Sequence, residues 1–128
     1  MQAADGSWTD SNKTANDPCP TGYRVPTKAQ WDGLIGNNMI TDLGIPWIGI
    51  TTNYSTGKKI GDRLFLPAAG YRYGSSTGKL FERGYNGNYW GSSKDSSIKA
   101  WQLYFDSGII NTGSGDRVFG LSIRCIAE

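Results

Sequence analysis

Residues 100–105, Ala100-Trp101-Gln102-Leu103-Tyr104-Phe105, decide the fold class, because large apolar side chains alternate there with more polar ones. Successive side chains of a β-strand point to opposite faces, so this period of two predicts a strand that is buried on one face. Trp101, Leu103 and Phe105 are expected to point into a core, and Gln102 and Tyr104 to point outward. The stretch therefore predicts a sheet with one face left for other uses.

Turn residues surround this strand on both sides. Asn86-Gly87 precedes it as a tight-turn dipeptide, and Ser107-Gly108 and Gly113-Ser114-Gly115 follow it as expected turns. Beyond them, apolar side chains alternate again and predict a closing strand. One face of that strand consists of Phe119, Leu121, Ile123 and Cys125.

One short helix is expected in the N-terminal half. It begins at a capping box, Thr27-Lys28-Ala29-Gln30, in which the Thr27 hydroxyl accepts from the backbone N–H of Gln30 and the glutamine reaches back. Trp31, Leu34 and Ile35 follow at helical spacing, and Gly36 is expected to end the helix. Its role is structural.

The middle of the chain is expected to hold loops and short strands. Residues 37–62 are rich in glycine and asparagine, with a brief strand predicted at 47–50. The apolar run 63–66 predicts a central strand buried on both faces, ending at Pro67. Two short strands, 71–73 and 79–82, flank a Gly-Ser-Ser-Thr-Gly turn.

Length and composition indicate one β-rich domain. The chain has 128 residues, with 18 glycines, 5 tryptophans, 7 tyrosines and 4 phenylalanines. Many turn residues together with many aromatic residues favour short strands joined by loops over a helical bundle. Residues 1–16 are polar and are expected to be a flexible tail or linker remnant, and residues 17–128 are expected to form the domain.

The charge pattern argues against nucleic-acid and membrane partners. The net charge is +2, and the 13 basic residues are scattered. No apolar stretch approaches the roughly 20 residues that span a bilayer. Residues 1–5 lack the basic and apolar regions of a signal peptide, so a signal or an upstream domain is expected to precede this chain.

Cys19 and Cys125 lie near opposite ends of the chain. In an oxidising compartment a disulfide bridge is the natural interpretation, and closing so long a loop would stabilise the fold by about 4–5 kcal/mol. The alternative is two buried thiols in a cytosolic protein. With no histidine in the chain, two cysteines cannot form a structural zinc site, and the commonest base for a serine or cysteine nucleophile is absent. An enzyme is therefore not expected, and no cofactor is expected.

The carboxylates leave two minor alternatives open. Asp106 and Asp116 could form the acid pair of a hydrolase, although nothing in the sequence pairs them. Asp106, Asn111 and Asp116 could supply oxygen ligands to a structural calcium ion, but turn-capping is the favoured role for these side chains.

The order of motifs along the chain is more specific than any single motif. It runs as Asp17-Pro18-Cys19-Pro20, Tyr23-Arg24-Val25-Pro26-Thr27, Trp31, Leu64-Phe65-Leu66-Pro67-Ala68-Ala69-Gly70-Tyr71-Arg72, Gly87-Asn88-Tyr89-Trp90-Gly91-Ser92-Ser93, Ala100-Trp101, Leu103-Tyr104-Phe105 and Gly120-Leu121-Ser122-Ile123-Arg124-Cys125. From about Asp17 onward the chain resembles the Fibrobacter succinogenes major paralogous domain family, which is common in Bacteroidetes surface proteins and their phages. The family usually has serine where Gly91 stands.

The resemblance implies an α+β, C-type-lectin-like fold of the formylglycine-generating-enzyme subtype, with short antiparallel strands, one or two short helices and long loops. It also implies a lectin-type terminal disulfide between Cys19 and Cys125, in place of a catalytic cysteine pair. Similar domains are targets of diversity-generating retroelements, which vary residues of the C-terminal strands and loops. No calcium-ligand triplet of sugar-binding C-type lectins is present.

These observations predict a ligand-binding or adhesion domain, extracellular, at a cell surface or on a phage particle. Its ligand would be a protein or glycan on a cell surface. Tyrosine and asparagine on loops combine rigid area with adaptable hydrogen bonds. The expected outward, ligand-binding residues are Tyr85, Asn86, Asn88, Gln102, Tyr104, Asn111 and Asp116. The alternatives are a structural cap of a longer surface or fimbrial protein, which binds nothing, and a carbohydrate-binding module with a tryptophan platform.

Overall fold

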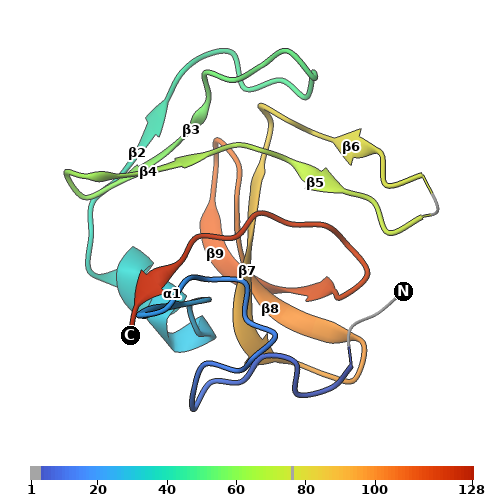
Figure 1. Ribbon diagram of the computed structural model, residues 1–128. Coiled ribbons are helices and arrows are strands. Elements are labelled where there is room, and N and C mark those ends of the chain that lie inside the picture. Colours follow the sequence, from blue (N-terminus) through green and yellow to red (C-terminus); the bar gives the residue numbers. More distant parts are fainter. Residues whose placement is uncertain (1–3, 76) are drawn as a thin grey trace.

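The computed structural model describes residues 4–75 and 77–128. In that part of the chain, short strands joined by turns form four small sheets, and one helix lies against them (Figure 1). The elements are β1 Tyr23–Arg24, α1 Lys28–Gly36, β2 Ile40–Leu43, β3 Gly57–Ile60, β4 Leu64–Pro67, β5 Tyr71–Arg72, β6 Leu80–Phe81, β7 Gly87–Lys94, β8 Lys99–Phe105, β9 Ile110–Asp116 and β10 Ile126–Ala127.

The predicted α+β, C-type-lectin-like class is wrong. Over the described residues, helical structure amounts to the nine residues of α1, and all paired strands are antiparallel. The molecule is a small β-rich domain. A helix of nine residues is too short to be stable alone, so packing against the rest of the domain stabilises α1.

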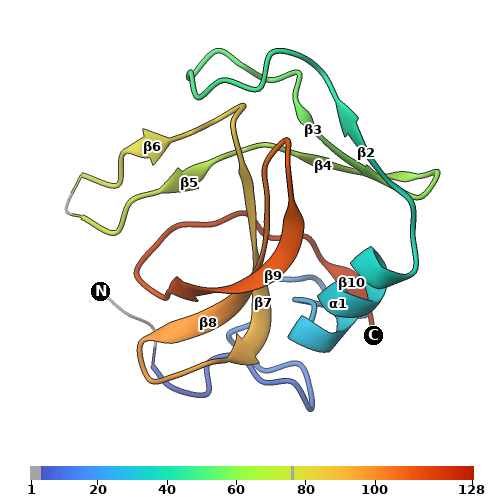
Figure 2. The same cartoon turned by 180° about the vertical axis from the view of Figure 1, so that it is seen from behind.

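The three-stranded sheet β7–β8–β9 is the centre of the domain (Figure 2). Its middle strand β8 contains the alternation found in the sequence, and Leu103 and Phe105 are both fully buried. Their burial is worth roughly 1.5–3 kcal/mol each. The prediction of a turn at 113–115 is wrong, because these residues belong to β9 and pair with residues 100–102.

Helix α1 covers one face of this sheet. Its predicted capping box is confirmed, with Thr27 accepting from the Gln30 backbone and the Gln30 side chain accepting from the Thr27 backbone. Trp31 is buried and donates its Nε1–H to the Trp90 carbonyl, with 3.2 Å between the two atoms. The Lys28 ammonium lies 4.6 Å from the centroid of the Trp101 ring. The core-facing side of the sheet is thereby closed.

A second sheet, β2–β3–β4, packs beside the core. The predicted central strand at 63–66 is instead the edge strand β4, in which only Leu66 is buried. Strands β2 and β3 arise in the stretch expected to be loop, and residues 47–50 form no strand. Next along the chain, β5 and β6 pair antiparallel within the short strands expected at 71–73 and 79–82, and residue 76 of the turn predicted between them lies outside the described residues.

The two ends of the domain meet at a disulfide bridge between Cys19 and Cys125, which confirms the expected pairing. Beside it, β1 and β10 pair antiparallel. The predicted closing strand at 119–125 is wrong: within it, isolated bridges join Gly120 to Arg72 and Ser122 to Tyr89. No helix in the described part of the chain is both long and apolar enough to cross a membrane.

Candidate functional site

The face of the central sheet opposite α1 carries several of the predicted site residues. Tyr104 in β8 lies between Asn88 in β7 and Asn111 in β9, each directly opposite it in register. Asn111 is exposed, Tyr104 is half-buried and Asn88 is buried. The three strands therefore place one row of polar side chains across the sheet, which we call the tyrosine row.

Gln102 stands one step along β8 from the tyrosine row, on the same face. It lies between Trp90 and Gly113 in register. Its Oε1 atom is buried and has no hydrogen-bond partner within the described residues. A buried acceptor without a partner lowers the stability of the fold by about 1–3 kcal/mol, and a donor supplied by a ligand would remove this cost. An added Cβ at Gly113 would meet nothing within 4 Å, which leaves the sheet open beside it.

The hydroxyl of Tyr104 is tied to an acid. It donates to Asp106, with 3.1 Å between Oη and Oδ2, and Asp106 also accepts from the backbone N–H groups of Gly108 and Ile109. Burial and this bond to Asp106 raise the pKa of Tyr104 to about 12. Tyr85 and Glu82 add to the rise, so Tyr104 stays neutral and keeps donating.

Asn86 and Asn88 differ from the expectation of exposed residues, since both are buried. Asn88 Nδ2 donates to Asn86 Oδ1 at 2.8 Å, and Asn86 Nδ2 donates to the Glu82 carboxylate. The turn lies at residues 83–85 rather than at Asn86-Gly87. Glu82 has a left-handed φ of 58°. Both asparagines therefore belong to the scaffold, and Tyr85, 42 % exposed, is the residue that this turn presents outward.

Asp106 and Asp116 do not form a pair. Asp116 faces Lys99 at the start of β8, and Asp106 follows Phe105 at its end. Seven residues separate Lys99 from Asp106, so at about 3.4 Å per residue the two acids are about 24 Å apart along the strand, beyond the reach of a hydrolytic carboxylate pair. The same separation prevents them from sharing one calcium ion with Asn111. Among the described residues, no group of three or more histidine, cysteine or acidic side chains is placed to hold a metal.

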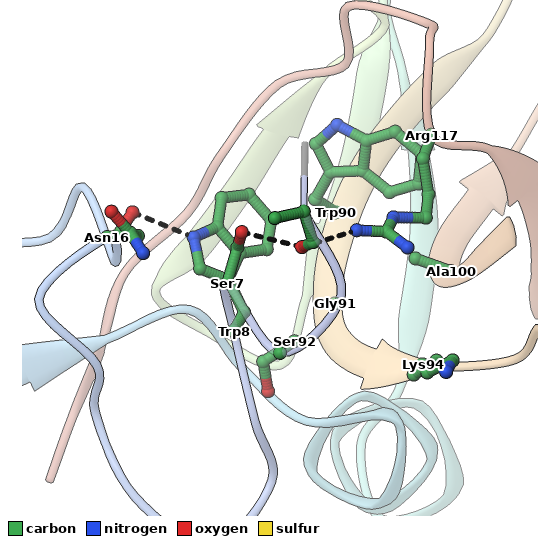
Figure 3. Close-up of a pocket in the computed structure, with 11 residues that line it drawn as sticks. Ser7, Trp8, Asn16, Trp90, Gly91, Ser92, Lys94, Ala100 and Arg117 are labelled. Carbon is green, nitrogen blue, oxygen red and sulfur yellow. Dashed lines mark hydrogen bonds between the residues drawn. The ribbon is translucent and has the colours of Figure 1, made fainter. Parts of the chain in front are cut away.

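A cavity of about 490 Å³ opens on the same face of the sheet, at its far end from the tyrosine row. Trp90 and Ala100 form its floor, and Trp8 and Arg117 stand around it (Figure 3). An added Cβ at Gly115 would lie 3.5 Å from Cη2 of Trp90, an ordinary van der Waals distance, so the ring lies over this position of β9. We call this space the tryptophan cavity; its lining is Ala4, Gly6, Ser7, Trp8, Asn16, Trp90, Gly91, Ser92, Lys94, Ala100 and Arg117.

The other wall of the tryptophan cavity comes from residues 4–16, part of the predicted tail or linker 1–16, of which residues 1–3 lie outside the described residues. Asp5 accepts from Lys94 at 2.9 Å and from Arg117 at 2.6 Å, and Asp10 accepts from Ser93 at 2.6 Å. The hydrogen bonds from Lys94 and Arg117 lower the pKa of Asp5. Lys94, Arg117 and Ser93 lie more than 80 positions along the chain from the acids that they contact. In the sequence, the one indication that this polar segment packs against the domain is the apolar Trp8.

Together these features define a small β-rich domain, closed by a disulfide, with polar and aromatic side chains on the free face of its central sheet. Residues 54–126 match the family model described as "Domain of unknown function (DUF8237)", and because this is more than half of the chain, the chain belongs to that family. No curated protein and no solved structure matches the chain. The matched span includes the whole central sheet but not residues 4–16.

Proposed function

We propose that the chain is a ligand-binding or adhesion domain that uses the free face of the β7–β8–β9 sheet. The observation that carries the proposal is the arrangement of Gln102, Tyr104 and Asn111, which occupy neighbouring positions of two paired strands on the face opposite α1. Tyr85 stands beside them, close enough to influence Tyr104.

The chemistry of this face suits recognition more than catalysis. Tyrosine supplies a rigid amphipathic ring, and glutamine and asparagine supply hydrogen bonds of either sense. Gln102 has a buried acceptor without a partner, and its amide lies against Gly115, beside the open position at Gly113. A protein or glycan displayed on a cell surface would offer such donors.

The disulfide supports a place outside the cytoplasm. Cys19–Cys125 bridges persist in oxidising compartments, where reducing systems do not open them. We therefore propose that the domain works in the extracellular space, on a cell surface or on a phage particle.

The resemblance to the Fibrobacter succinogenes major paralogous domain family motivates a further part of the proposal, that retroelements diversify this face. Variation would then concentrate at Gln102, Tyr104, Asn111 and Tyr85. It would spare Asn86 and Asn88, whose hydrogen bonds are buried. Sequences of close paralogues test this, and variation no greater at these four positions than elsewhere would reject it.

Binding itself is tested with the purified domain on a glycan array and against immobilised surface-protein extracts of bacterial cells. We expect saturable binding that Tyr85→Ala and Asn111→Ala each weaken, because both side chains are exposed on the proposed face. Tyr54→Ala is the matched control, since Tyr54 is 74 % exposed and belongs to the loop before β3. A folded domain that binds neither glycans nor proteins would favour a structural cap instead.

A further inference from the structure

We propose that the tryptophan cavity binds a small ligand that carries a ring and one carboxylate. The ring would lie between Trp8 and Trp90, and the carboxylate would take the place of Asp5 on Lys94 and Arg117. This inference does not rest on the proposed function, because it involves different residues.

The size and the walls of the cavity fit a ring. Its volume of about 490 Å³ falls within the range of small-molecule sites, roughly 300–1,000 Å³. Trp8 is half-buried and contributes the larger apolar face, while Trp90 is 7 % exposed and contributes a smaller part of its ring, with the small Ala100 side chain beside it. Trp8 donates its Nε1–H to the Asn16 carbonyl at 2.9 Å, so its ring is held in place and offers its face rather than its N–H (Figure 3). A planar or saturated ring can pack on such faces.

The charges at the cavity favour an anion. Two cations, Lys94 and Arg117, share the single carboxylate of Asp5. The Arg117 side chain is 12 % exposed and is also held by the carbonyls of Ala4 and Ser97, whereas the Asp5 side chain is 53 % exposed. The Lys94 side chain is as exposed as that of Asp5, at 53 %, so Arg117 is the fixed member of this cluster and the Asp5 carboxylate is the partner that a ligand could replace. A guanidinium group beside an ammonium group is a strong receptor for a carboxylate.

Displacing Asp5 would leave the wall of the cavity standing. The N-terminal segment is also held by Arg24, which donates to the Thr9 carbonyl, and by Asp10, which accepts from Ser93. Arg117 keeps its bond to the Ala4 carbonyl at 2.8 Å. Asp5 thus acts as an internal competitor for the site.

Two pairs of probes separate the ring from the charge. Phenylacetate and D-glucuronate each carry a ring and a carboxylate, and phenylacetamide and D-glucose are their uncharged counterparts. We expect at least one acid to shift the indole N–H signals of Trp8 and Trp90 in ¹⁵N NMR spectra, saturably and more tightly than its counterpart. Phenylacetate binding would indicate an aromatic acid, and glucuronate binding an acidic sugar.

Variants test the exchange of carboxylates. Asp5→Asn should tighten binding of the acid by roughly two- to five-fold, the size of an exposed ion pair, and should leave the uncharged probe unaffected. Lys94→Gln should weaken binding of the acid by a similar factor. Lys79→Gln, which removes an exposed lysine on the β5–β6 hairpin, should change nothing. Trp8→Ala should abolish the shift of the Trp90 signal.

The proposal is overturned if neither acid shifts the two indole signals, or if the uncharged probes bind as tightly as the acids. It is also overturned if Lys94→Gln leaves the affinity for the acid unchanged. Lys94→Gln tests the carboxylate site even if Asp5→Asn displaces the N-terminal segment, because Lys94 lies on β7 and not in that segment. Failure here leaves the proposed function intact, because that function is tested at Tyr85 and Asn111, which do not line the tryptophan cavity.

Discussion

Removing the Cys19–Cys125 bridge should cost this domain about a third or more of its stability. The bridge joins residues 106 positions apart, so it closes nearly the whole chain. In the chain-entropy model a loop of that length lowers the entropy of the unfolded chain by about 16 cal/mol/K, which is about 4.8 kcal/mol at 25 °C. Single domains unfold at roughly 5–15 kcal/mol, so a loss of this size brings the fold near its limit.

The double variant Cys19→Ala/Cys125→Ala measures this loss by urea unfolding, followed through tryptophan fluorescence. Alanine is chosen because Cys19 is buried and a serine hydroxyl there would lack a partner. Each single variant should lose nearly as much as the double variant, since either one opens the same loop. A loss below about 2 kcal/mol, less than native bridges usually contribute, would refute the loop-closure argument and weaken the case for an oxidising compartment.

Two further predictions concern particular side chains. Burial raises the pKa of Asp17, but the backbone N–H groups of Val25 and Cys19 and the Lys13 ammonium outweigh it, so the net pKa is lowered from 3.8. The ionised carboxylate of Asp17 therefore stabilises the folded state above the unfolded-state pKa of 3.8, and this stabilisation is lost as the pH falls through the lower folded-state pKa. In urea unfolding, Asp17→Asn should lower the free energy of unfolding by about 1–3 kcal/mol at pH 7, and by less at pH 3. Gly87→Ala should lower the free energy of unfolding by about 1–3 kcal/mol, because the new Cβ would lie 2.1 Å from Cζ of Phe105. Gly113→Ala is the control, because an added Cβ there meets nothing within 4 Å, and equal thermal midpoints for the two variants would contradict this packing.

Local patterns predicted the elements whose causes are local. The capping box at Thr27 needs only residues three positions apart, so the start of α1 could be found from the sequence. The alternation of Leu103 and Phe105 with Gln102 follows from strand geometry alone, and it identified both the core face and the free face of β8. The sequence therefore indicated the sheet on which the tyrosine row lies.

The glycines at 113 and 115 gave a wrong prediction, because tertiary contacts determine the structure there. Gly113 and Gly115 read as turn residues, yet both lie in β9. At Gly115 the Gln102 side chain occupies the space that a larger residue would need, with Nε2 of Gln102 only 2.8 Å from an added Cβ, and the Trp90 ring would be in ordinary contact at 3.5 Å. Neither neighbour is close in sequence, so propensity alone points to a turn.

The tryptophan cavity could not be predicted from the sequence either, because it also depends on contacts between distant parts of the chain. One of its walls is built by contacts such as Asp5 to Arg117, which join opposite ends of the chain. A polar segment with few apolar residues ordinarily predicts a tail. Its order here comes from single ion pairs and hydrogen bonds made to a sheet that does not exist until the last third of the chain has folded.

The alternation within β8 has a consequence for how the proposed binding face could vary in sequence. Each residue on the free face is followed by one in the core, so Gln102 and Tyr104 can be replaced while Leu103 and Phe105 keep their packing. The strand ladder depends on backbone groups, which substitutions of these side chains leave in place. Asn88 is different, because its buried amide belongs to the chain of hydrogen bonds that fixes the preceding turn. A binding surface that varies without loss of the fold is therefore expected on β8 and β9, with β7 held constant as its support.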